Sequence, residues 1–277
     1  MHCVYHNDCS DGFLSAFVVR SKYPAAVFHP MVYGDDPPVI PKGKTLVVTD
    51  FSFSAEVLLE YSKICRKVVV LDHHDTAVRT LSDYFEKNPK PDNLELHLDL
   101  HQSGAGITWR YFYPELEPNW LVKHIEDYDL WRFRYPLSES IAAYVQLQPY
   151  DFKAWENMLL MDPEEVSRIG RMFLTKERHD VEWHLKHTSF RAMIGGYLVP
   201  VANAPRYLAS KLANGMAKDQ PFAMTYYEDD TNRYFSLRSE EGAVDVSLIA
   251  EIYGGGGQEN SAGFIIKKKD IMPGNVV

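Results

Sequence analysis

Short apolar runs alternate with segments of helical periodicity through the first half of the chain. The runs at residues 2–5, 45–50 (TLVVTD) and 67–72 (KVVVLD) are predicted strands, and helical patterns such as residues 12–22 (GFLSAFVVRSK) lie between them. Strands that alternate with helices predict an α/β fold with a mostly parallel sheet and helices on both faces. Runs such as VVVL, which lack a polar alternation, fit strands that are buried on both sides. Further strands are predicted within residues 25–34 and 94–100.

The second half of the chain is first helical and then mixed. Residues 119–133, 151–160 and 163–187 carry helical patterns, and the last of these is long and charged, which is typical of a connector. From about residue 190, strands and helices alternate again around a predicted hairpin at Asp229 to Asn232. We therefore expect a larger α/β domain at 1–160, a connecting helix at 161–190 and a smaller mixed α/β domain at 191–277.

Composition narrows the possible functions. The 277 residues are 45% hydrophobic, yet no apolar run is long enough to cross a bilayer, and the N-terminus (MHCVYHNDCS) lacks the pattern of a signal peptide. The three cysteines fit neither a disulfide framework nor a CxxC metal pattern, which predicts a reducing, cytoplasmic setting. A net charge of -9 argues against non-specific binding of long nucleic acid and suits either a small phosphorylated ligand or carboxylates that bind cations.

Ionisable side chains follow three of the predicted strands directly. The carboxyl ends of parallel strands meet at one edge of a sheet, which is where α/β proteins bind their ligands. We therefore expect the three clusters to converge although they are far apart in sequence. The clusters are His6, Asp8 and Asp11 after the first strand, Asp50 after TLVVT, and Asp72, His73 and His74 at the end of KVVVLD.

Converging carboxylates repel one another and raise one another's pKa, and divalent cations remove that cost. Aspartate oxygens and imidazole nitrogens without a thiolate set suit Mn²⁺, or a related hard to borderline metal, better than structural Zn²⁺. Two such ions, roughly 3.5–4 Å apart and bridged by a carboxylate, would clamp a phosphoryl group and activate a water. A further ligand is expected in HIEDYDLW, where Asp127 and Asp129 are both candidates.

Structural explanations compete at several of these positions. Asp11 would cap a helix that begins at Gly12, and this role is compatible with metal binding. Asp50 taken alone is explained by turn chemistry, and His6 taken alone by a hydrogen-bonded histidine at a strand end. Asp75 is expected to cap the next helix. Only the coincidence of three clusters at three strand ends favours a metal site.

The glycine run GGGGQENSAGF (254–264) is the other conspicuous segment. Ending the preceding helix requires one glycine rather than four. Glycines permit close approach of the backbone, and successive N–H groups can cradle a phosphate or carboxylate oxygen. Arg238, which precedes the run, is a candidate for a forked contact to phosphate, although exposed arginines in strands are usually only solvated.

LDHHD together with GGGGQENSAGF resembles the DHH phosphoesterase superfamily, in its two-domain form with the DHH-associated C-terminal domain. The resemblance spans nearly the whole chain in the expected order. It implies that one Mn²⁺ is held by His6, Asp8 and Asp50, and a second Mn²⁺ by Asp11, Asp50, His73 and Asp129, with Asp50 bridging; Mg²⁺ or Co²⁺ could substitute. It further implies catalytic roles for Asp72 and His74, and a second domain that grips the substrate. The implied substrate contacts are Arg238, Gly255, Gly256, Gly257 and Gln258, together with Ser103 and His101 around the segment SGAG (103–106).

Two features depart from the family pattern. The first motif has an extra residue between its aspartates, in DCSD, and Gln258 stands where the family has histidine. Glutamine can hydrogen-bond a phosphate oxygen but carries no positive charge. The resemblance implies a manganese-dependent phosphodiesterase or exonuclease that acts on short oligonucleotides or small dinucleotides. A polyphosphate or pyrophosphate hydrolase and a non-catalytic nucleotide-binding protein remain alternatives, and the natural substrate, the polarity of cleavage and the oligomeric state stay open.

Overall fold

A five-stranded parallel sheet organises the first part of the computed structural model, which describes residues 1–7 and 9–270. Every neighbouring pair runs parallel, so all the strands end at the same edge. The predicted α/β class with a mostly parallel sheet is therefore confirmed. The strand order is β2-β1-β3-β4-β5, with β1 (His2–His6), β2 (Val27–Met31), β3 (Thr45–Thr49), β4 (Lys67–Asp72) and β5 (Leu94–Leu98).

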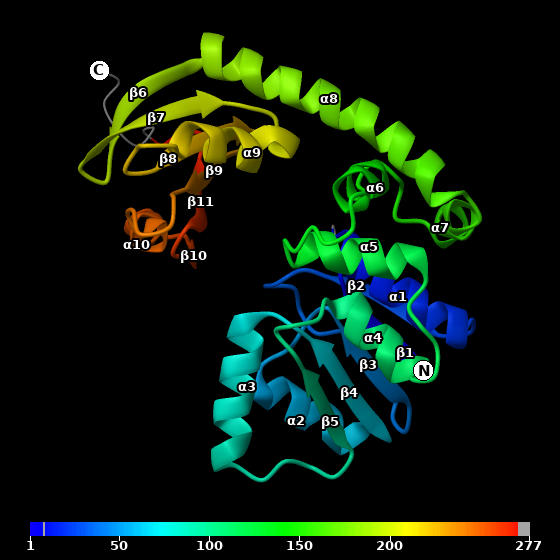
Figure 1. Cartoon of the computed structure of the whole chain (residues 1–277). Helices are drawn as coiled ribbons and strands as arrows, with labels where there is room; N and C mark the ends of the chain where they lie inside the picture. Colours follow the sequence, from blue (N-terminus) through cyan, green and yellow to red (C-terminus); the bar gives the residue numbers. More distant parts are fainter. Residues whose placement is uncertain (8, 271–277) are drawn as a thin grey trace. The chain divides into compact units, whose positions relative to one another are not determined.

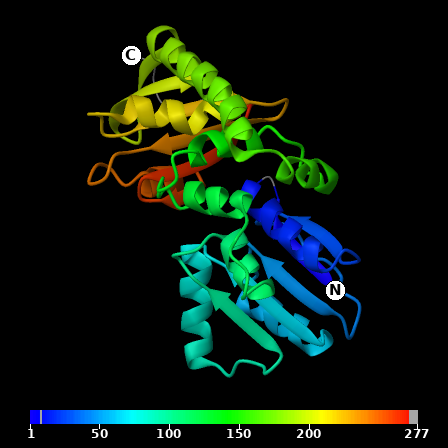
Figure 2. The same cartoon turned by 45° about the vertical axis from the view of Figure 1, so that its right-hand side comes forward.

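Successive side chains of the central strands enter different cores. Val47 and Val69 pack with residues of α1 (Ser10–Lys22) and α4 (Gly104–Phe112). Val48 and Val70 pack on the opposite face with residues of α2 (Ala55–Ile64) and α3 (Asp75–Lys87). This period of two explains why the strands read as continuous apolar runs, because both of their faces are covered (Figure 1, Figure 2).

Four further helices complete the first unit or leave it: α5 (Trp120–Asp129), α6 (Ser138–Val145), α7 (Phe152–Leu159) and α8 (Pro163–His187). Trp155 of α7 is fully buried, with its ring edge-on to Phe13 of α1 at a centroid distance of 4.9 Å. The segment predicted as helical through residue 133 ends earlier, at Asp129. The reason is that the carboxylate of Asp127 accepts hydrogen bonds from the amides of residues 134 and 135, which turns the chain.

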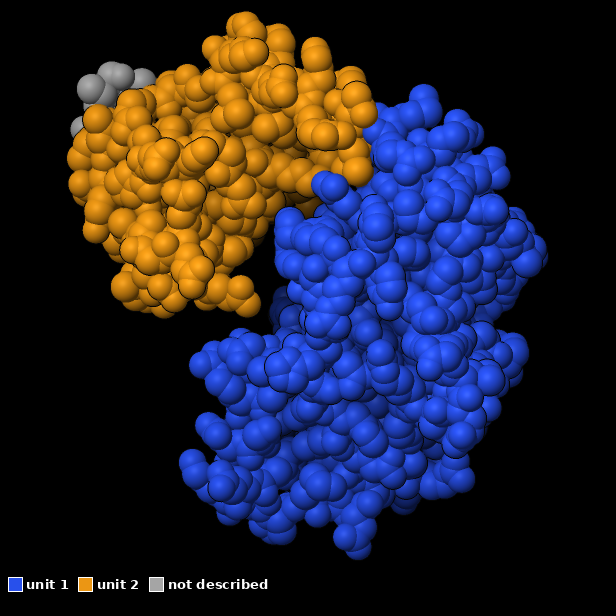
Figure 3. Space-filling view, viewed as in Figure 1, with its two compact units in different colours: residues 1–173 blue, residues 174–277 orange. Residues whose placement is uncertain are grey.

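The chain divides into two units, Met1–Phe173 and Leu174–Val277 (Figure 3), and the division falls inside α8. The second unit is a six-stranded mixed sheet, in which only β7 and β8 are parallel neighbours. Residues of α9 (Arg206–Ala217) pack on one face and residues of α10 (Val246–Ile252) on the other. The order is β10-β11-β9-β8-β7-β6, with β6 (Ser189–Ile194), β7 (Tyr197–Asn203), β8 (Ala223–Glu228), β9 (Asn232–Arg238), β10 (Gly256–Gln258) and β11 (Ser261–Lys267).

No helix within residues 1–7 and 9–270 combines the length and the apolar character that a membrane span requires. The longest of them, α8, has 25 residues and carries charged side chains along its length.

Gly170 allows α8 to approach α6 closely. A Cβ atom at this position would lie 1.8 Å from the carbonyl oxygen of Ser140. We predict that Gly170→Ala lowers the free energy of unfolding of the first unit by about 1–3 kcal/mol, because the added carbon forces the two helices apart. Denaturant unfolding followed by circular dichroism measures this change.

Gly215→Ala is the matched control, since Gly215 also lies in a helix. Its Cβ atom would meet only the methyl groups of Leu185, at 3.6 Å. This variant should be as stable as the wild type or more stable, by up to about 1 kcal/mol from helix propensity. Equal effects of the two substitutions would contradict the close helix contact.

Candidate metal centre

The side chains that follow the strands converge at the carboxyl edge of the parallel sheet. His6 ends β1, Asp72 ends β4, Asp50 follows β3 directly, and His73 and His74 follow β4. Asp11 reaches the same place from the first turn of α1, and Asp129 from the last residue of α5. Three sets of potential ligand atoms lie within 4.8 Å of one another: His6, Cys9 and Asp50; Asp50, His73 and His74; Asp11, His73 and Asp129. Asp8 lies outside the described residues.

His73 stands among three carboxylates. Its Nε2 atom lies 3.1 Å from Oδ1 of Asp50, 3.6 Å from Oδ2 of Asp129 and 3.9 Å from Oδ2 of Asp11. Asp11 and Asp50 are buried; Asp11 comes from the first turn of α1 and Asp50 from the residue after β3. With His73, these carboxylates make up the set that the family resemblance implies for one of two cations.

Asp50 and His6 belong to a second set of candidate metal ligands. Oδ2 of Asp50 lies 3.6 Å from Nδ1 of His6, and both atoms are buried without a hydrogen-bond partner among the described residues. Buried polar atoms without a partner are costly and rare in folded proteins. A cation shared by the two atoms would remove that cost, so these residues fit a metal. Asp50 therefore offers one oxygen to each set, as a bridging ligand must.

The backbone holds Asp50 in an unfavourable conformation. Its φ angle is 51°, in the left-handed region that non-glycine residues seldom adopt, and its N–H group donates to the carbonyl of Leu71 at 2.9 Å. Gly104, at the start of α4, makes room for it: a Cβ atom on Gly104 would lie 2.4 Å from Cβ of Asp50. Backbone strain that the surroundings enforce is typical of functional sites.

The close packing of these carboxylates around His73 shifts the pKa values of all four residues. Burial, followed by the charges of Asp50 and Asp129, raises the pKa of Asp11 well above its ordinary value, and burial raises that of Asp129 to about 6. Burial alone would lower the pKa of His73, but its contact with Asp50 and the surrounding carboxylates raise it to about 10. Burial alone would raise the pKa of Asp50, and contacts with His6 and His73 lower it instead. A protonated His73 thus offsets the acids where a divalent cation would otherwise do so.

Asp11 does not cap its own helix, contrary to one of the alternatives open in the sequence. Cys9 is the N-terminal cap of α1, and it makes no side-chain capping bond. The carboxylate of Asp11 instead accepts the amide of Ala105, at 3.2 and 3.3 Å, near the start of α4. The amides and the dipole at that helix end favour a negative charge. Asp11 is thereby anchored against the helix that also carries Gly104.

Asp72 and His74 form a pair beside the ligand cluster. Asp72 is fully buried, and its Oδ1 atom accepts the amide of His73 at 2.8 Å and Nδ1 of His74 at 2.7 Å. Burial alone would lower the pKa of His74, but the hydrogen bond to Asp72 raises it. The second oxygen of Asp72, Oδ2, is buried without a hydrogen-bond partner among the described residues. Asp72 thus orients the ring of His74 through Nδ1, and Nε2 is not used in this contact.

The structure separates the roles of Asp127 and Asp129. The carboxylate of Asp127 accepts the amides of Arg134 at 2.9 Å and Tyr135 at 3.1 Å and the hydroxyl of Ser138 at 2.6 Å. These hydrogen bonds of its carboxylate hold the segment between α5 and α6. Asp129 instead contacts His73, and it belongs to the ligand cluster.

Ser103 and His101, predicted near the substrate, take different positions. Ser103 is buried and caps α4, where its hydroxyl accepts the amide of Gly106 at 3.2 Å. His101 is exposed, and its carbonyl accepts a hydrogen bond from Arg132 at 2.5 Å. Gly104 lies in the SGAG segment, but its role beside Asp50 could not be read from the sequence. Cys9, which groups with His6 and Asp50, was not among the predicted residues; burial, followed by the charges of Asp50 and Asp11, raises the pKa of its thiol.

The glycine run of the second unit has largely structural explanations. Gly254 ends α10 with a φ angle of 77°. The amide of Gly255 donates to the carbonyl of Ala250 at 2.9 Å, so it is engaged at the helix end rather than free to bind phosphate. Cβ atoms on Gly255 and Gly257 would collide with β11, whereas one on Gly256 would meet nothing within 4 Å. Three of the four glycines thus have a structural reason: Gly254 ends the helix, and Gly255 and Gly257 pack against β11.

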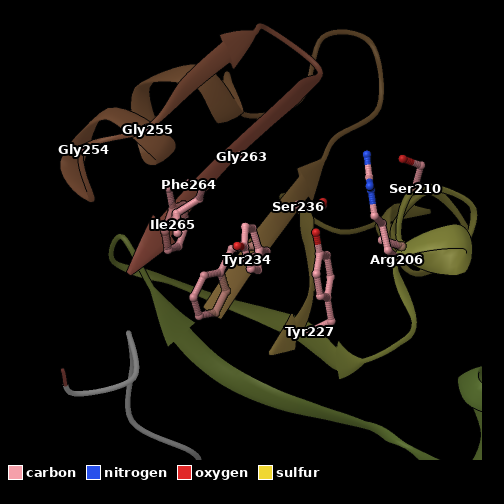
Figure 4. Close-up of a pocket in the computed structure, with 12 residues that line it drawn as sticks. Arg206, Ser210, Tyr227, Tyr234, Ser236, Gly254, Gly255, Gly263, Phe264 and Ile265 are labelled. Carbon is pink, nitrogen blue, oxygen red and sulfur yellow. The ribbon is translucent and has the colours of Figure 1, made fainter. Parts of the chain in front are cut away.

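A pocket of about 530 Å³ lies beside this run (Figure 4). Tyr227 and Tyr234 stack across β8 and β9 at a centroid distance of 4.8 Å and an interplanar angle of 7°, and both line the pocket with Arg206 of α9. Of the predicted substrate contacts, Gly255 lines it; Arg238, Gly256, Gly257 and Gln258 do not. Arg238 is half-buried and donates to the carbonyl of Leu237 and, at 2.7 Å, to Oγ of Ser210. Gln258 is exposed in β10.

Comparison with known proteins finds no matching family model. An uncharacterized protein of Acanthamoeba polyphaga mimivirus is 30% identical over 293 residues, an alignment that includes 94% of this chain but only 66% of the viral protein. The chain thus spans slightly less than two thirds of that relative.

Solved structures with a similar backbone include three bacterial proteins. An uncharacterized protein from Helicobacter pylori is 15% identical, with a TM-score of 0.40 and coverage of 99% of this chain and 94% of the other. A pGpG-specific phosphodiesterase from Vibrio cholerae is 12% identical, with a TM-score of 0.45 and coverage of 97% and 94%. An exopolyphosphatase-related protein from Bacteroides fragilis is 13% identical, with a TM-score of 0.48 and coverage of 98% and 87%.

Two aspartates of the same helix provide a matched test of the centre. We predict that Asp129→Asn weakens Mn²⁺ binding at least about tenfold, because it removes a charged ligand. The metal-free variant should be no less stable than the wild type, since the raised pKa of Asp129 shows that its charged form is disfavoured in the fold. Calorimetric titration with Mn²⁺ and thermal unfolding in EDTA measure the two effects.

Asp127→Asn should show the reverse pattern. It loses an acceptor for the amides of the turn, which should cost about 1–3 kcal/mol of stability, and it should bind Mn²⁺ nearly as the wild type does. If Asp127→Asn abolished metal binding while Asp129→Asn preserved it, the assignment of the two residues would be reversed.

Gly104→Ala tests the placement of Asp50. The added carbon would force Asp50 to move, so we predict at least about a tenfold loss of Mn²⁺ affinity with all of the candidate ligands intact. Gly256→Ala is the control, because its Cβ atom would have open space. The same titration compares the two variants, and unchanged affinity in Gly104→Ala would show that Asp50 is not held as described.

Proposed function

We propose that this chain is a metal-dependent phosphodiesterase of the DHH type that hydrolyses short oligonucleotides or small dinucleotides. The observation that carries this proposal is the double environment of Asp50. One oxygen of this buried carboxylate faces His73, and the other faces the unpartnered nitrogen of His6. Two adjacent cation sites that share one carboxylate are the arrangement that phosphoryl-transfer enzymes use.

The proposed ligands are those that the family resemblance implies. His6, Asp8 and Asp50 would hold one Mn²⁺, and Asp11, Asp50, His73 and Asp129 would hold the other, with Mg²⁺ or Co²⁺ as possible substitutes. When bound, such a pair supplies an activated water and positive charge for the phosphoryl oxygens. The donor set of carboxylates and imidazoles supports this choice of metal.

The other residues of the edge have supporting tasks in this proposal. Asp72 fixes the ring of His74 through Nδ1, so that Nε2 can exchange a proton or a hydrogen bond with the phosphate group or the water. Gly104 keeps the space into which Asp50 fits, and the amide of Ala105 anchors Asp11. Each side chain is therefore positioned before a substrate arrives, which is what electrostatic catalysis requires.

The second unit supports a nucleotide more than a polyphosphate. Its pocket presents two stacked tyrosine rings and an arginine, a combination suited to a base and a phosphate group. A polyphosphate offers no ring for the tyrosines to stack on. Within the proposed function, this pocket of the second unit is suited to a nucleotide group, and Gln258 of the neighbouring β10 contributes no charge.

The experiment incubates the chain with Mn²⁺ and a 5′-labelled dinucleotide, with polyphosphate and pyrophosphate as separate substrates. We predict release of mononucleotides that stops in EDTA and returns when Mn²⁺ is added. Asp50→Asn and His73→Ala should each reduce turnover by at least about 100-fold, because each removes a ligand. Product chromatography over time gives the rates.

His179→Ala is the matched control for His73→Ala, since His179 is exposed on α8 and lies outside the ligand cluster. It should retain most of the wild-type rate. Hydrolysis of polyphosphate alone would identify the second candidate activity. Tight binding of the dinucleotide with no product in Mn²⁺, Mg²⁺ or Co²⁺ would leave a nucleotide-binding protein and exclude the hydrolase.

A further inference from the structure

The segment at residues 131–135, which follows the proposed ligand Asp129 by two positions, alternates between aromatic residues and arginines. Its residues are Trp131, Arg132, Phe133, Arg134 and Tyr135. The three rings are exposed to 68%, 40% and 46%. Core packing therefore does not account for them, and a tryptophan with two thirds of its surface exposed is unusual. The chain as a whole has a net charge of -9, but this segment contains two arginines and no acidic residue, so it is locally positive.

The backbone of this segment is held in a costly conformation. Trp131 and Phe133 have φ angles of 50° and 49°, in the left-handed region that bulky residues avoid. The amide of Arg132 donates to the carbonyl of Asp127 at 3.0 Å, and the Asp127 carboxylate accepts the amides of Arg134 and Tyr135. The turn is thus fixed by hydrogen bonds. Strained backbone that is held in this way is typical of functional sites and not of a loose loop.

The same turn is tied to the edge of the sheet that carries the metal centre. The guanidinium of Arg132 donates to the carbonyl of His101, in the loop after β5. Asp129, only two residues before Trp131, lies 3.6 Å from Nε2 of His73. The turn therefore begins two residues after a member of the ligand cluster and is held against the loop that follows β5.

Trp131 has one supported face and a large exposed surface. Its ring stacks on Tyr128 at a centroid distance of 6.0 Å with an interplanar angle of 28°, and it meets the edge of Phe133 at 5.1 Å and 75°. A ring braced by other rings can offer its free surface to a ligand without reorganising. Aromatic rings combined with arginines are the means by which proteins bind single-stranded nucleic acid.

We propose that Trp131 is a substrate-binding residue that stacks on a nucleobase of the substrate, with Arg134 placed to contact a neighbouring phosphate. This inference rests on the proposed function and makes it narrower: the substrate carries a base, and is neither polyphosphate nor a simple phosphate diester. A protein partner could also use an exposed tryptophan, but the interleaved arginines and the proximity of the metal centre favour a nucleotide.

Equilibrium dialysis with a ³²P-labelled dinucleotide tests the stacking separately from turnover, with Ca²⁺ in place of Mn²⁺. Trp131→Ala should weaken binding on the order of tenfold, whereas Trp131→Phe should restore most of the affinity. Trp131→Gly, which accepts the left-handed backbone without strain, should lose as much affinity as Trp131→Ala. Trp183→Ala is the matched control, because Trp183 is also exposed but lies in the regular helix α8.

The second arm uses an abasic analogue of the same dinucleotide. The affinity of the wild type for the abasic analogue should be about as low as the affinity of Trp131→Ala for the complete dinucleotide. Trp131→Ala should bind the abasic analogue no more weakly than the wild type does. Equal losses for both ligands, or unchanged binding of the dinucleotide by Trp131→Ala, would overturn the stacking proposal. If binding depends on Trp131 and the base but no condition gives hydrolysis, the proposed enzyme fails while the stacking site stands.

Discussion

The mutual repulsion of buried carboxylates at one edge of a parallel sheet is the constraint around which the first unit is arranged. Asp11, Asp50 and Asp129 surround a single imidazole, and two of the three have raised pKa values. The fold tolerates this because β1, β3 and β4 are stable for other reasons, namely apolar residues buried on both faces. A rigid, fully covered sheet thus carries a set of charges that would not assemble without it. The same charges are what a pair of cations requires.

Much of this edge could be predicted from the sequence because strand ends are easy to recognise. Continuous apolar runs mark the doubly covered strands, and a run that stops at Asp50 or Asp72 shows where the buried segment ends. Parallel topology then places residues such as His6 and His73 at the same edge, since every strand of the sheet finishes there. Local sequence and topology together were sufficient for the convergence of the described clusters.

The parts that could not be predicted depend on contacts between distant segments. Nothing near residue 104 indicates that its missing Cβ atom makes room for Asp50, which lies 54 positions earlier. Asp11 looks like a cap for α1, yet its carboxylate accepts the amide of Ala105 in another helix. The structural role of the glycine run was hidden for a related reason: the backbone of Gly255 packs against β11, and sequence alone does not show which strand lies beside it.

Asp127 and Asp129 show how one short segment can serve stability and chemistry at once. Asp127 uses its oxygens to close the turn after α5, and that turn ends the helix at the point where Asp129 faces His73. The described residues with a left-handed backbone other than glycine are Asp50, Trp131, Phe133 and Asp219, so three of these four lie in the candidate metal centre or in the turn attached to it. Strain is therefore concentrated where ligands and exposed rings must be held, rather than spread through the fold. The Asp127 carboxylate accepts the amides of Arg134 and Tyr135 and so holds the turn in this conformation, which means that a residue outside the ligand sets shapes the candidate site.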